Sequence, residues 1–171
     1  MNEEYVSKTS IPDIDTGDTF RCTLGVDNSA RVSYKLTSTS KTSRPSSFTE
    51  QYKISTYTST TTIQNRHTAN YPISIVEKSS VPVAPEGDNS IKVFLRKPEG
   101  LAESENEVEI DLMRQDGFKV KWMSGENGSE GGEKQGKFVW HGSVGSGEEV
   151  NLVSEWEVRT PIDFDWYELT L

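Results

Sequence analysis

The sequence predicts an all-β domain, a mainly antiparallel β-sandwich of about seven to nine strands that is immunoglobulin-like in having two facing sheets. Three observations predict this class. The chain is 171 residues long, the size of one ordinary domain, and no segment keeps apolar residues at helical spacing over three turns. Apolar and polar residues instead alternate at short intervals between clusters of turn residues. The apolar residues are mostly β-branched or aromatic, and 21 serines and 16 threonines add further strand and turn formers.

Short alternating stretches predict individual strands in the first part of the chain. They lie at residues 20–24, 32–36, 71–75 and 91–95. Residues 25–28, Gly-Val-Asp-Asn, have the composition of a turn between the first two strands. The segment Val81-Pro82-Val83-Ala84-Pro85 follows the third, and its prolines predict a rigid turn or a sheet edge.

A longer extended stretch covers residues 48–65. Tyr52 and Ile54 have one parity along it, whereas Tyr57 and Ile63 have the other. Because successive side chains of a strand point to opposite faces, this change of phase predicts a bulge or two consecutive strands.

The segment 103–123 has the pattern of a hairpin. Acidic and apolar residues alternate along its first half, so one side of the predicted strand carries a comb of carboxylates: Glu103, Glu105, Glu107, Glu109 and Asp111. A two-residue loop at Asp116-Gly117 would place Leu112 opposite Lys121, an apolar residue against a charge. A three-residue loop, Gln115-Asp116-Gly117, instead pairs Leu112 with Val120, Ile110 with Trp122 and Asp111 with Lys121. The sequence therefore predicts the second register, with Gly117 in the left-handed conformation.

Residues 124–136 contain five glycines and little to bury, which predicts a mobile loop. Strand patterns resume directly afterwards, so this is a loop inside one domain, residues 1–171, and not a linker. A second hairpin is predicted there, with Val144 opposite Val150 and Phe138 opposite Trp156, and Pro161 ends its second strand.

Charge and composition limit the partners. The net charge is −9, and residues 86–171 carry 19 of the 27 acidic side chains, so a nucleic-acid surface is not expected. Neither a run of eighteen apolar residues nor a signal peptide is present in the chain, so no membrane contact is expected. Cys22 is the only cysteine and cannot form an internal disulfide. An intracellular, cytoplasmic protein is therefore predicted.

The residues best suited to catalysis do not form a recognisable site. Cys22 shares the parity of Phe20 and Leu24, which predicts a core residue in preference to a reactive thiol. His67 follows a predicted strand end and His141 is out of phase with Trp140, so each is predicted to be a surface histidine and not a general base. No nucleophile-elbow, phosphate-loop or zinc-protease motif occurs. A non-enzyme with no catalytic, metal or cofactor residues is predicted.

Other candidate ligand surfaces have simpler interpretations. The comb at 103–111 spreads over about 13 Å and does not converge on one ion, so edge protection and pairing with Lys119 and Lys121 are preferred to calcium binding. The threonines 58 and 60–62 could form a ligand face or a glycosylated strip, although a solvated strand is preferred. Four tryptophans could stack on sugars, but three have the inward parity, which favours a core role. They are Trp122, Trp140, Trp156 and Trp166.

Several segments, in their order and spacing, resemble the C-terminal domain of unknown function of the mucoidy inhibitor A-like family. They are residues 20–27 (FRCTLGVD), Asn65-Arg66, Val81-Pro82-Val83, Ile91-Lys92-Val93, residues 136–140 (GKFVW), Leu152 and Pro161. The resemblance spans about residues 5–161 and implies a fragment of a longer, fungal-type protein. Ser79-Ser80 replaces the acidic residue usual before the Val-Pro step, and residues 124–136 resemble an insertion. The family has no established catalytic residues to transfer to this chain.

The sequence thus predicts a noncatalytic protein-interaction or assembly module of a larger protein, with self-association as one form of this function. A carbohydrate-binding sandwich module is the alternative. For self-association, unpaired edges near Tyr5–Ile11 and Phe20–Leu24 are the predicted docking region, since the acidic comb blocks its own edge.

Overall fold

The computed structural model describes residues 26–43, 51–68, 70–87, 90–105, 108–112, 117–124, 131–162 and 164. These residues form eight strands, a 3-10 turn and a single α-helical turn. In chain order they are β1 (Ala30–Thr42), β2 (Tyr52–Asn65), β3 (Ile73–Ser80), β4 (Lys92–Lys97), η1 (Leu101–Glu103), β5 (Ile110–Asp111), β6 (Lys119–Trp122), α1 (Gly132–Gln135), β7 (Lys137–Val144) and β8 (Glu149–Pro161).

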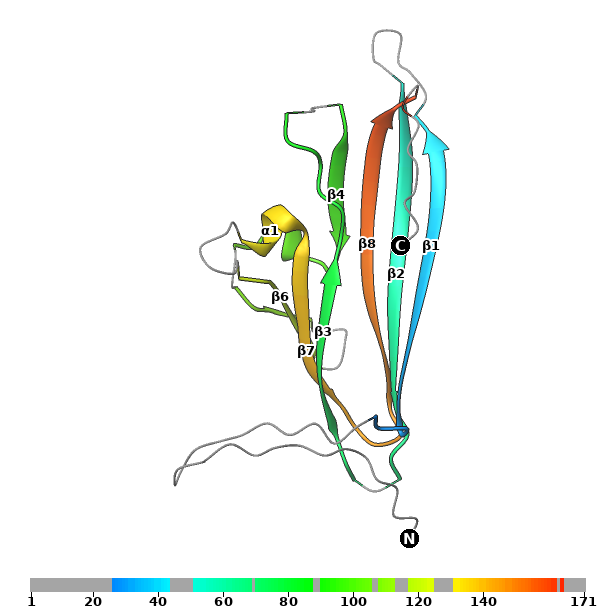
Figure 1. The fold of residues 1–171 in the computed structure, drawn as a ribbon, viewed down its shortest axis with the longest axis vertical. Coiled ribbons are helices and arrows are strands. Elements are labelled where there is room, and N and C mark those ends of the chain that lie inside the picture. The colour runs from blue at the N-terminus through cyan, green and yellow to red at the C-terminus, as the bar shows by residue number, and fades with distance from the viewer. Residues whose placement is uncertain are drawn as a thin grey trace.

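The strands form two four-stranded sheets, and every pairing is antiparallel. Sheet A has the order β1-β2-β8-β4, and sheet B has the order β3-β7-β6-β5. The predicted antiparallel β-sandwich is therefore confirmed. In Figure 1 the long strands β1, β2 and β8 continue along the long axis past the ends of β3 and β7, and β1 lies at the side of sheet A farthest from sheet B.

The core lies between the two sheets and consists mainly of alternate residues of β2, β6, β7 and β8. Sheet B contributes Phe118, Val120, Trp122, Phe138, Trp140 and Val144, and sheet A contributes Ile63, Val150, Leu152, Trp156 and Val158. Aromatic rings contact each other on both sides: Phe138 meets Trp122 edge-on, and Trp156 stacks on Tyr57 at 5.6 Å between ring centroids. The three described tryptophans are at most 9% exposed, so their predicted core role is confirmed, while Trp166 lies outside the described residues.

The predicted bulge or double strand within 48–65 is wrong. β2 is one continuous strand, and its register against β1 and against β8 runs without a shift. Tyr52 and Ile54 lie on the outer face of sheet A, opposite Pro161 and Arg159 of β8. Residues on both faces of this end of β2 are half-buried. Apolar side chains can therefore switch from one face to the other along the strand without a bulge in the backbone.

The first hairpin has the predicted faces but a different register. Ile110 pairs with Val120 and Asp111 with Lys119, two residues from the prediction, and the Leu112 amide donates to the Phe118 carbonyl. A shift of two keeps every side chain on its predicted face, so parity could not detect it. Gly117 has the predicted left-handed conformation, with φ of 78°. Residues 103–112 do not form one strand, because Glu103 ends η1 and β5 contains two residues.

The predicted hairpin of β7 with β8 is wrong, because the two strands belong to different sheets. The turn at 145–148 carries the chain from sheet B to sheet A. It is held at the end of β2: the Asn65 amide donates to the Glu148 carbonyl, and the Gly147 amide donates to the Asn65 carbonyl. These bonds place the first residues of β8 beside the end of β2, so that Glu149 pairs with Gln64 and Val150 with Ile63.

The end of the glycine-rich segment contains a helical turn, and the predicted mobility of residues 124–136 stays a prediction. Gly132–Gln135 form α1, and Gly132 and Gly136 are buried. Gly136 has φ of 65°, and a Cβ there would lie 2.1 Å from the Val81 carbonyl oxygen. Gly136 therefore permits a close backbone approach to Val81, which follows β3. Residues 125–130 of the predicted loop lie outside the described residues.

Candidate interaction surface

Strand β1 forms one edge of sheet A over its whole length. It pairs with β2 from Ala30 opposite Asn65 to Thr42 opposite Lys53, without a bulge. Within the described part of the chain, no strand pairs with its other edge. Every residue from Arg31 to Thr42 is exposed.

The backbone groups on this free edge belong to the even-numbered residues. The Ser43 amide donates to the Tyr52 carbonyl, and the Arg66 amide donates to the Ser29 carbonyl, so odd-numbered residues of β1 point their backbone groups at β2. Successive residues of a strand point these groups in opposite directions. Val32, Tyr34 and Leu36 therefore direct their amides and carbonyls to the unpaired side of the strand.

The same three residues form an exposed apolar stripe. They face the inner side of sheet A, because Val32 is opposite the buried Ile63 and Tyr34 is opposite the buried Thr61. Sheet B does not cover them: Val32 is 46%, Tyr34 68% and Leu36 56% exposed. We call Val32, Tyr34 and Leu36 the β1 stripe.

One residue of the β1 stripe contacts sheet B. The Tyr34 hydroxyl forms a hydrogen bond with the carboxyl of Glu77 on β3. Burial raises the pKa of Glu77, although the hydrogen bond from Tyr34 acts in the opposite direction. Burial, and next the charge of Glu77, raise the pKa of Tyr34. The contact therefore joins β1, an edge strand of sheet A, to β3, an edge strand of sheet B, and leaves the rest of β1 exposed.

The other sheet edges are short or protected. β4 has six residues and a register irregularity between Leu95 and Lys97, and β5 has two residues. β3 has eight residues and carries Glu77 on its inner face. Short strands, bulges and inward-pointing charges all discourage pairing at an edge. β1 is the long and regular edge among the described strands.

Charges on the outer face of sheet A differ between its two sides. On the outer face, β1 carries three exposed cations, Arg31, Lys35 and Lys41. On the β4 side, the guanidiniums of Arg96 and Arg159 lie over the Phe94 ring, at 5.4 Å and 4.8 Å from its centroid. Glu157 belongs to this second group: burial acts to raise its pKa, but the hydrogen bond and charge of Arg159, with Arg96, lower it overall. The cations of β1 have no such carboxylate among the described residues.

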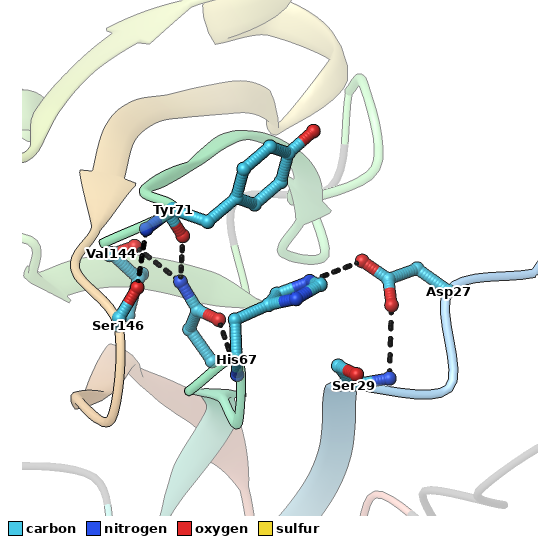
Figure 2. Close-up of polar contacts among 7 residues, drawn as sticks. Asp27, Ser29, His67, Tyr71, Val144 and Ser146 are labelled. Carbon is cyan, nitrogen blue, oxygen red and sulfur yellow. Dashed lines mark hydrogen bonds and ion pairs between the residues drawn. The ribbon is translucent and has the colours of Figure 1, made fainter. Parts of the chain in front are cut away.

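Asn65 holds the end of β2 where β1 begins. It is 1% exposed, and its amide nitrogen donates to the carbonyls of Tyr71 and Val144, at 2.8 Å and 2.9 Å. Its side-chain oxygen accepts a hydrogen bond from the His67 amide at 3.1 Å. Figure 2 shows that Tyr71, Val144 and His67, which bond to this side chain, lie close together. Asn65 therefore fixes the junction of the two sheets by side-chain to backbone bonds, in addition to its own backbone bonds to the turn at 145–148.

His67 joins this junction to the turn that precedes β1. Its Nε2 lies 2.8 Å from the carboxylate of Asp27, and its ring is 4.8 Å from that of Tyr71 (Figure 2). The hydrogen bond with His67, and next that from the Ser29 amide, lower the pKa of Asp27. In the described contacts the imidazole meets a carboxylate and an aromatic ring but no hydroxyl or thiol. An Asp-His pair of this kind can hold a turn in place, whereas nucleophilic catalysis would need a third group.

A pocket of about 210 Å³ lies on the inner face of sheet A, where β1, β2 and β8 extend past sheet B. It is lined by Ser38, Ser40, Lys53, Ser55, Tyr57, Val158 and Thr160. Ser40 and Ser55 form a hydrogen bond of 2.8 Å between their hydroxyls. Thr160 is 4% exposed, and its hydroxyl has no hydrogen-bond partner among the described residues. The pocket therefore offers hydroxyl groups, one ammonium group and an aromatic ring to a ligand.

The candidates from sequence are dispersed over the molecule. Cys22 lies outside the described residues, as do the predicted docking segments Tyr5–Ile11 and Phe20–Leu24. His67 is half-buried on the loop after β2, and His141 lies on β7, between Val76 and Lys119 and on the face opposite Trp140. The two histidines lie on different elements, and the described contacts of the His67 ring are with Asp27 and Tyr71.

The described part of the acidic comb is exposed, as predicted. Lys119 and Lys121 both approach Glu109, at 3.5 Å and 3.9 Å, so the predicted pairing with these lysines is confirmed for this residue. Thr58, Thr60 and Thr62 lie on the half-buried outer face of β2, whereas Thr61 is buried on the inner face. In the described residues, no three potential ligands among His, Cys, Asp and Glu gather into a metal site.

At the level of sequence, Asn65-Arg66 contributes only to the family resemblance, and Asn65 has no predicted structural role. The strand at 32–36 is predicted, but not the exposure of the β1 stripe. One signal for the edge position of β1 was available: after Leu36 the strand continues with hydroxyl residues and a lysine and has no further apolar residue to bury.

Comparison with known proteins identifies no relative, because no family model, curated protein or solved structure matches the chain. Within the described residues, no helix has the length and apolar composition needed to span a bilayer.

Proposed function

We propose that this chain is a noncatalytic protein-interaction or assembly module, which binds an extended segment of a protein partner along the free edge of β1. The observation that carries the proposal is the combination of a 13-residue regular edge strand with an exposed apolar stripe. Strand addition uses main-chain hydrogen bonds for affinity and alternate side chains for specificity. β1 offers both, because the residues with outward-directed backbone groups are also those of the β1 stripe.

The β1 stripe supplies a moderate driving force. Burying a large apolar side chain completely stabilises a complex by about 1.5–3 kcal/mol. The three side chains are about half exposed in the free chain, so each would contribute about 1 kcal/mol on covering. Main-chain hydrogen bonds would add to this, and ordering of the partner segment would oppose it. A reversible association is therefore expected.

The test is selection of extended peptides from a display library, followed by titration against variants. Val32→Lys with Leu36→Lys should weaken binding of selected peptides at least tenfold, because two charges replace the apolar contact. Val76→Lys is the matched control, since Val76 is equally exposed (61%) on the edge strand β3 of the other sheet. Bound peptide should also slow hydrogen exchange of the Val32, Tyr34 and Leu36 amides. Peptides that bind equally well to the double variant would overturn the proposal.

From the resemblance to the mucoidy inhibitor A-like family we further propose that this module belongs to a larger intracellular protein, although the resembling domain has no known function of its own. The resembling segments include the residues after β3, the start of β4 and the turn into β7, which all position core residues in this fold. We expect an experimental structure of an established family member to show the sheet orders β1-β2-β8-β4 and β3-β7-β6-β5. Different sheet orders would remove this support.

Carbohydrate binding is the second candidate, and the pocket at Thr160 is the observation that favours it. Its hydroxyls and the Lys53 ammonium could donate to sugar oxygens, and the Tyr57 ring could contact a sugar face. The tryptophans of the described region are buried, so stacking on a flat indole surface is not part of this candidate.

A glycan array followed by calorimetry tests this candidate. Thr160→Val removes the buried hydroxyl with little change of shape and should weaken any bound glycan about tenfold, since a lost hydrogen bond of this size costs about 1.4 kcal/mol. Ser74→Ala, at an exposed position of β3, should leave binding unchanged. An array without binders, or equal affinity of Thr160→Val, would exclude the pocket as a sugar site.

A further inference from the structure

We propose that the partner segment on β1 is β1 of a second copy of this chain, in an antiparallel pair with Tyr34 opposite Tyr34 on a two-fold axis. The inference rests on the proposed function and specifies its partner. It follows from the register that the residues of β1 allow when two copies of the strand are placed edge to edge.

Backbone geometry restricts the possible registers. In an antiparallel pair the inner faces of both strands must lie on the same side, so even-numbered residues pair with even-numbered residues. The even-numbered residues of β1 also carry the outward-directed backbone groups, and each such pair would exchange two hydrogen bonds. The remaining choice is the position of the two-fold axis along the strand.

Side-chain chemistry favours the axis at Tyr34. An axis at Ser33 would place Arg31 opposite Lys35, an axis at Lys35 would pair that residue with its own copy, and an axis at Leu36 would place Arg31 opposite Lys41. Each of these registers opposes two cations, which destabilises a sheet.

The axis at Tyr34 opposes no two cations, and of the possible axes it is the one that pairs all three residues of the β1 stripe with one another. It pairs Val32 with Leu36 and Tyr34 with Tyr34, so the β1 stripe of one copy covers that of the other. On the outer face it places Arg31 opposite Thr37 and Lys35 opposite Ser33, and no cation lies directly opposite another. The paired segment runs from Ala30 to Ser38 in each copy.

Among the described residues, the fold leaves space for this pairing. β1 is at the side of sheet A farthest from sheet B (Figure 1), and the side chains of the β1 stripe are exposed. The pair would join the two A sheets into one eight-stranded sheet, in the order β4-β8-β2-β1-β1-β2-β8-β4. A two-fold contact of this type is closed, so it predicts a dimer and not a fibre.

Salt dependence separates a second copy from an acidic partner. Two copies repel each other because each carries a net charge of −9. Their adjoining edges also repel each other, because each edge carries Arg31, Lys35 and Lys41. Raising the salt concentration screens this repulsion and should tighten the dimer. An acidic segment bound to the cationic edge would instead dissociate as salt increases.

The first experiment measures the mass of the full chain by light scattering and sedimentation over a wide concentration range, at low and high salt. We expect a concentration-dependent dimer that is tighter at high salt. Val32→Lys with Leu36→Lys should raise the dissociation constant at least tenfold, and Val76→Lys should not. A monomer at all concentrations, or a dimer insensitive to the double variant, would overturn the proposal.

The second experiment determines the register by disulfide formation in a Cys22→Ser background, which removes the only native cysteine. Ser33→Cys and Lys35→Cys proteins are oxidised separately and as a mixture. With the axis at Tyr34, residue 33 of one copy lies opposite residue 35 of the other, so the mixture should cross-link in preference to either protein alone. Cross-linking of Ser33→Cys alone, or of Lys35→Cys alone, would indicate an axis at that residue and overturn the proposed register.

The outcomes also separate this proposal from the function on which it rests. If the chain is monomeric but a selected peptide protects the β1 amides, self-pairing is wrong and strand addition stands. If neither a second copy nor a peptide protects β1, both are wrong. Binding of an acidic peptide that weakens with salt, without a dimer, would assign the edge to a different protein partner.

Discussion

Asn65 should be among the most sensitive polar residues of this fold. Asn65→Ala removes two donated hydrogen bonds and one accepted hydrogen bond, while the variant side chain supplies no replacement. The bond to the Val144 carbonyl is buried and the other two are partly buried. Leaving a buried partner unsatisfied costs about 1–3 kcal/mol, so we assign about 2 kcal/mol to Val144 and about 1 kcal/mol to each of the others. The expected loss is about 4 kcal/mol of unfolding free energy.

Urea unfolding followed by tryptophan fluorescence measures this loss. Domains of this class have unfolding free energies of about 5–15 kcal/mol, so the variant should remain folded but unfold at a much lower urea concentration. Gln64→Ala is the neighbouring control. Its side chain contacts Arg66 and Glu149 at the surface, and its removal should change stability by about 0.5 kcal/mol or less.

A second variant tests the direction of the hydrogen bonds. Asn65→Asp keeps the shape but turns an oxygen toward two carbonyl oxygens, and it should be less stable than Asn65→Ala at neutral pH. Acid should restore part of the difference, because a protonated carboxyl can again donate. A loss of less than about 1 kcal/mol of unfolding free energy in Asn65→Ala would refute the role of this residue in fixing the junction of the two sheets.

Three further predictions follow from the core and the titrating groups. A Cβ at Gly142 would lie 2.5 Å from the Phe118 ring, so Gly142→Ala should lower the unfolding free energy by about 1–3 kcal/mol in thermal or urea unfolding. Ser143→Ala, at the exposed neighbouring position, should leave the unfolding free energy unchanged. Equal stabilities of the two variants would contradict the packing of Gly142 against Phe118. Burial raises the pKa of Glu77, so its stabilising contribution is present below the unfolded-state pKa and is lost as pH rises through the folded-state pKa. Glu77→Gln should therefore stabilise the chain at pH 7–8 but not near pH 4, and a pH-independent difference would argue against a buried carboxyl. The hydrogen bond with His67 lowers the pKa of Asp27, so NMR titration should place this carboxyl below its ordinary range, and His67→Ala should move it upward; an unchanged titration would show that the pair does not form in solution.

Local alternation determined the strands and their faces. The segments at 32–36, 71–75, 91–95 and 118–122 all contain strands, and Phe138, Trp140 and Val144 have the inward parity that the sequence predicted. These features depend on side-chain period and turn chemistry over a few residues. For the same reason, Gly117 could be assigned the left-handed conformation before its partners were known.

Tertiary structure decided the pairing and the exposure. A two-residue shift of the first hairpin preserves every face, so only packing selects Ile110 opposite Val120. β8 joins β2 instead of β7 because the turn at 145–148 is hydrogen-bonded to Asn65, a contact between residues about eighty positions apart. The β1 stripe has the same alternating pattern as a buried strand. It is exposed because sheet B does not extend over β1. The local sequence of β1 cannot indicate how far the facing sheet extends.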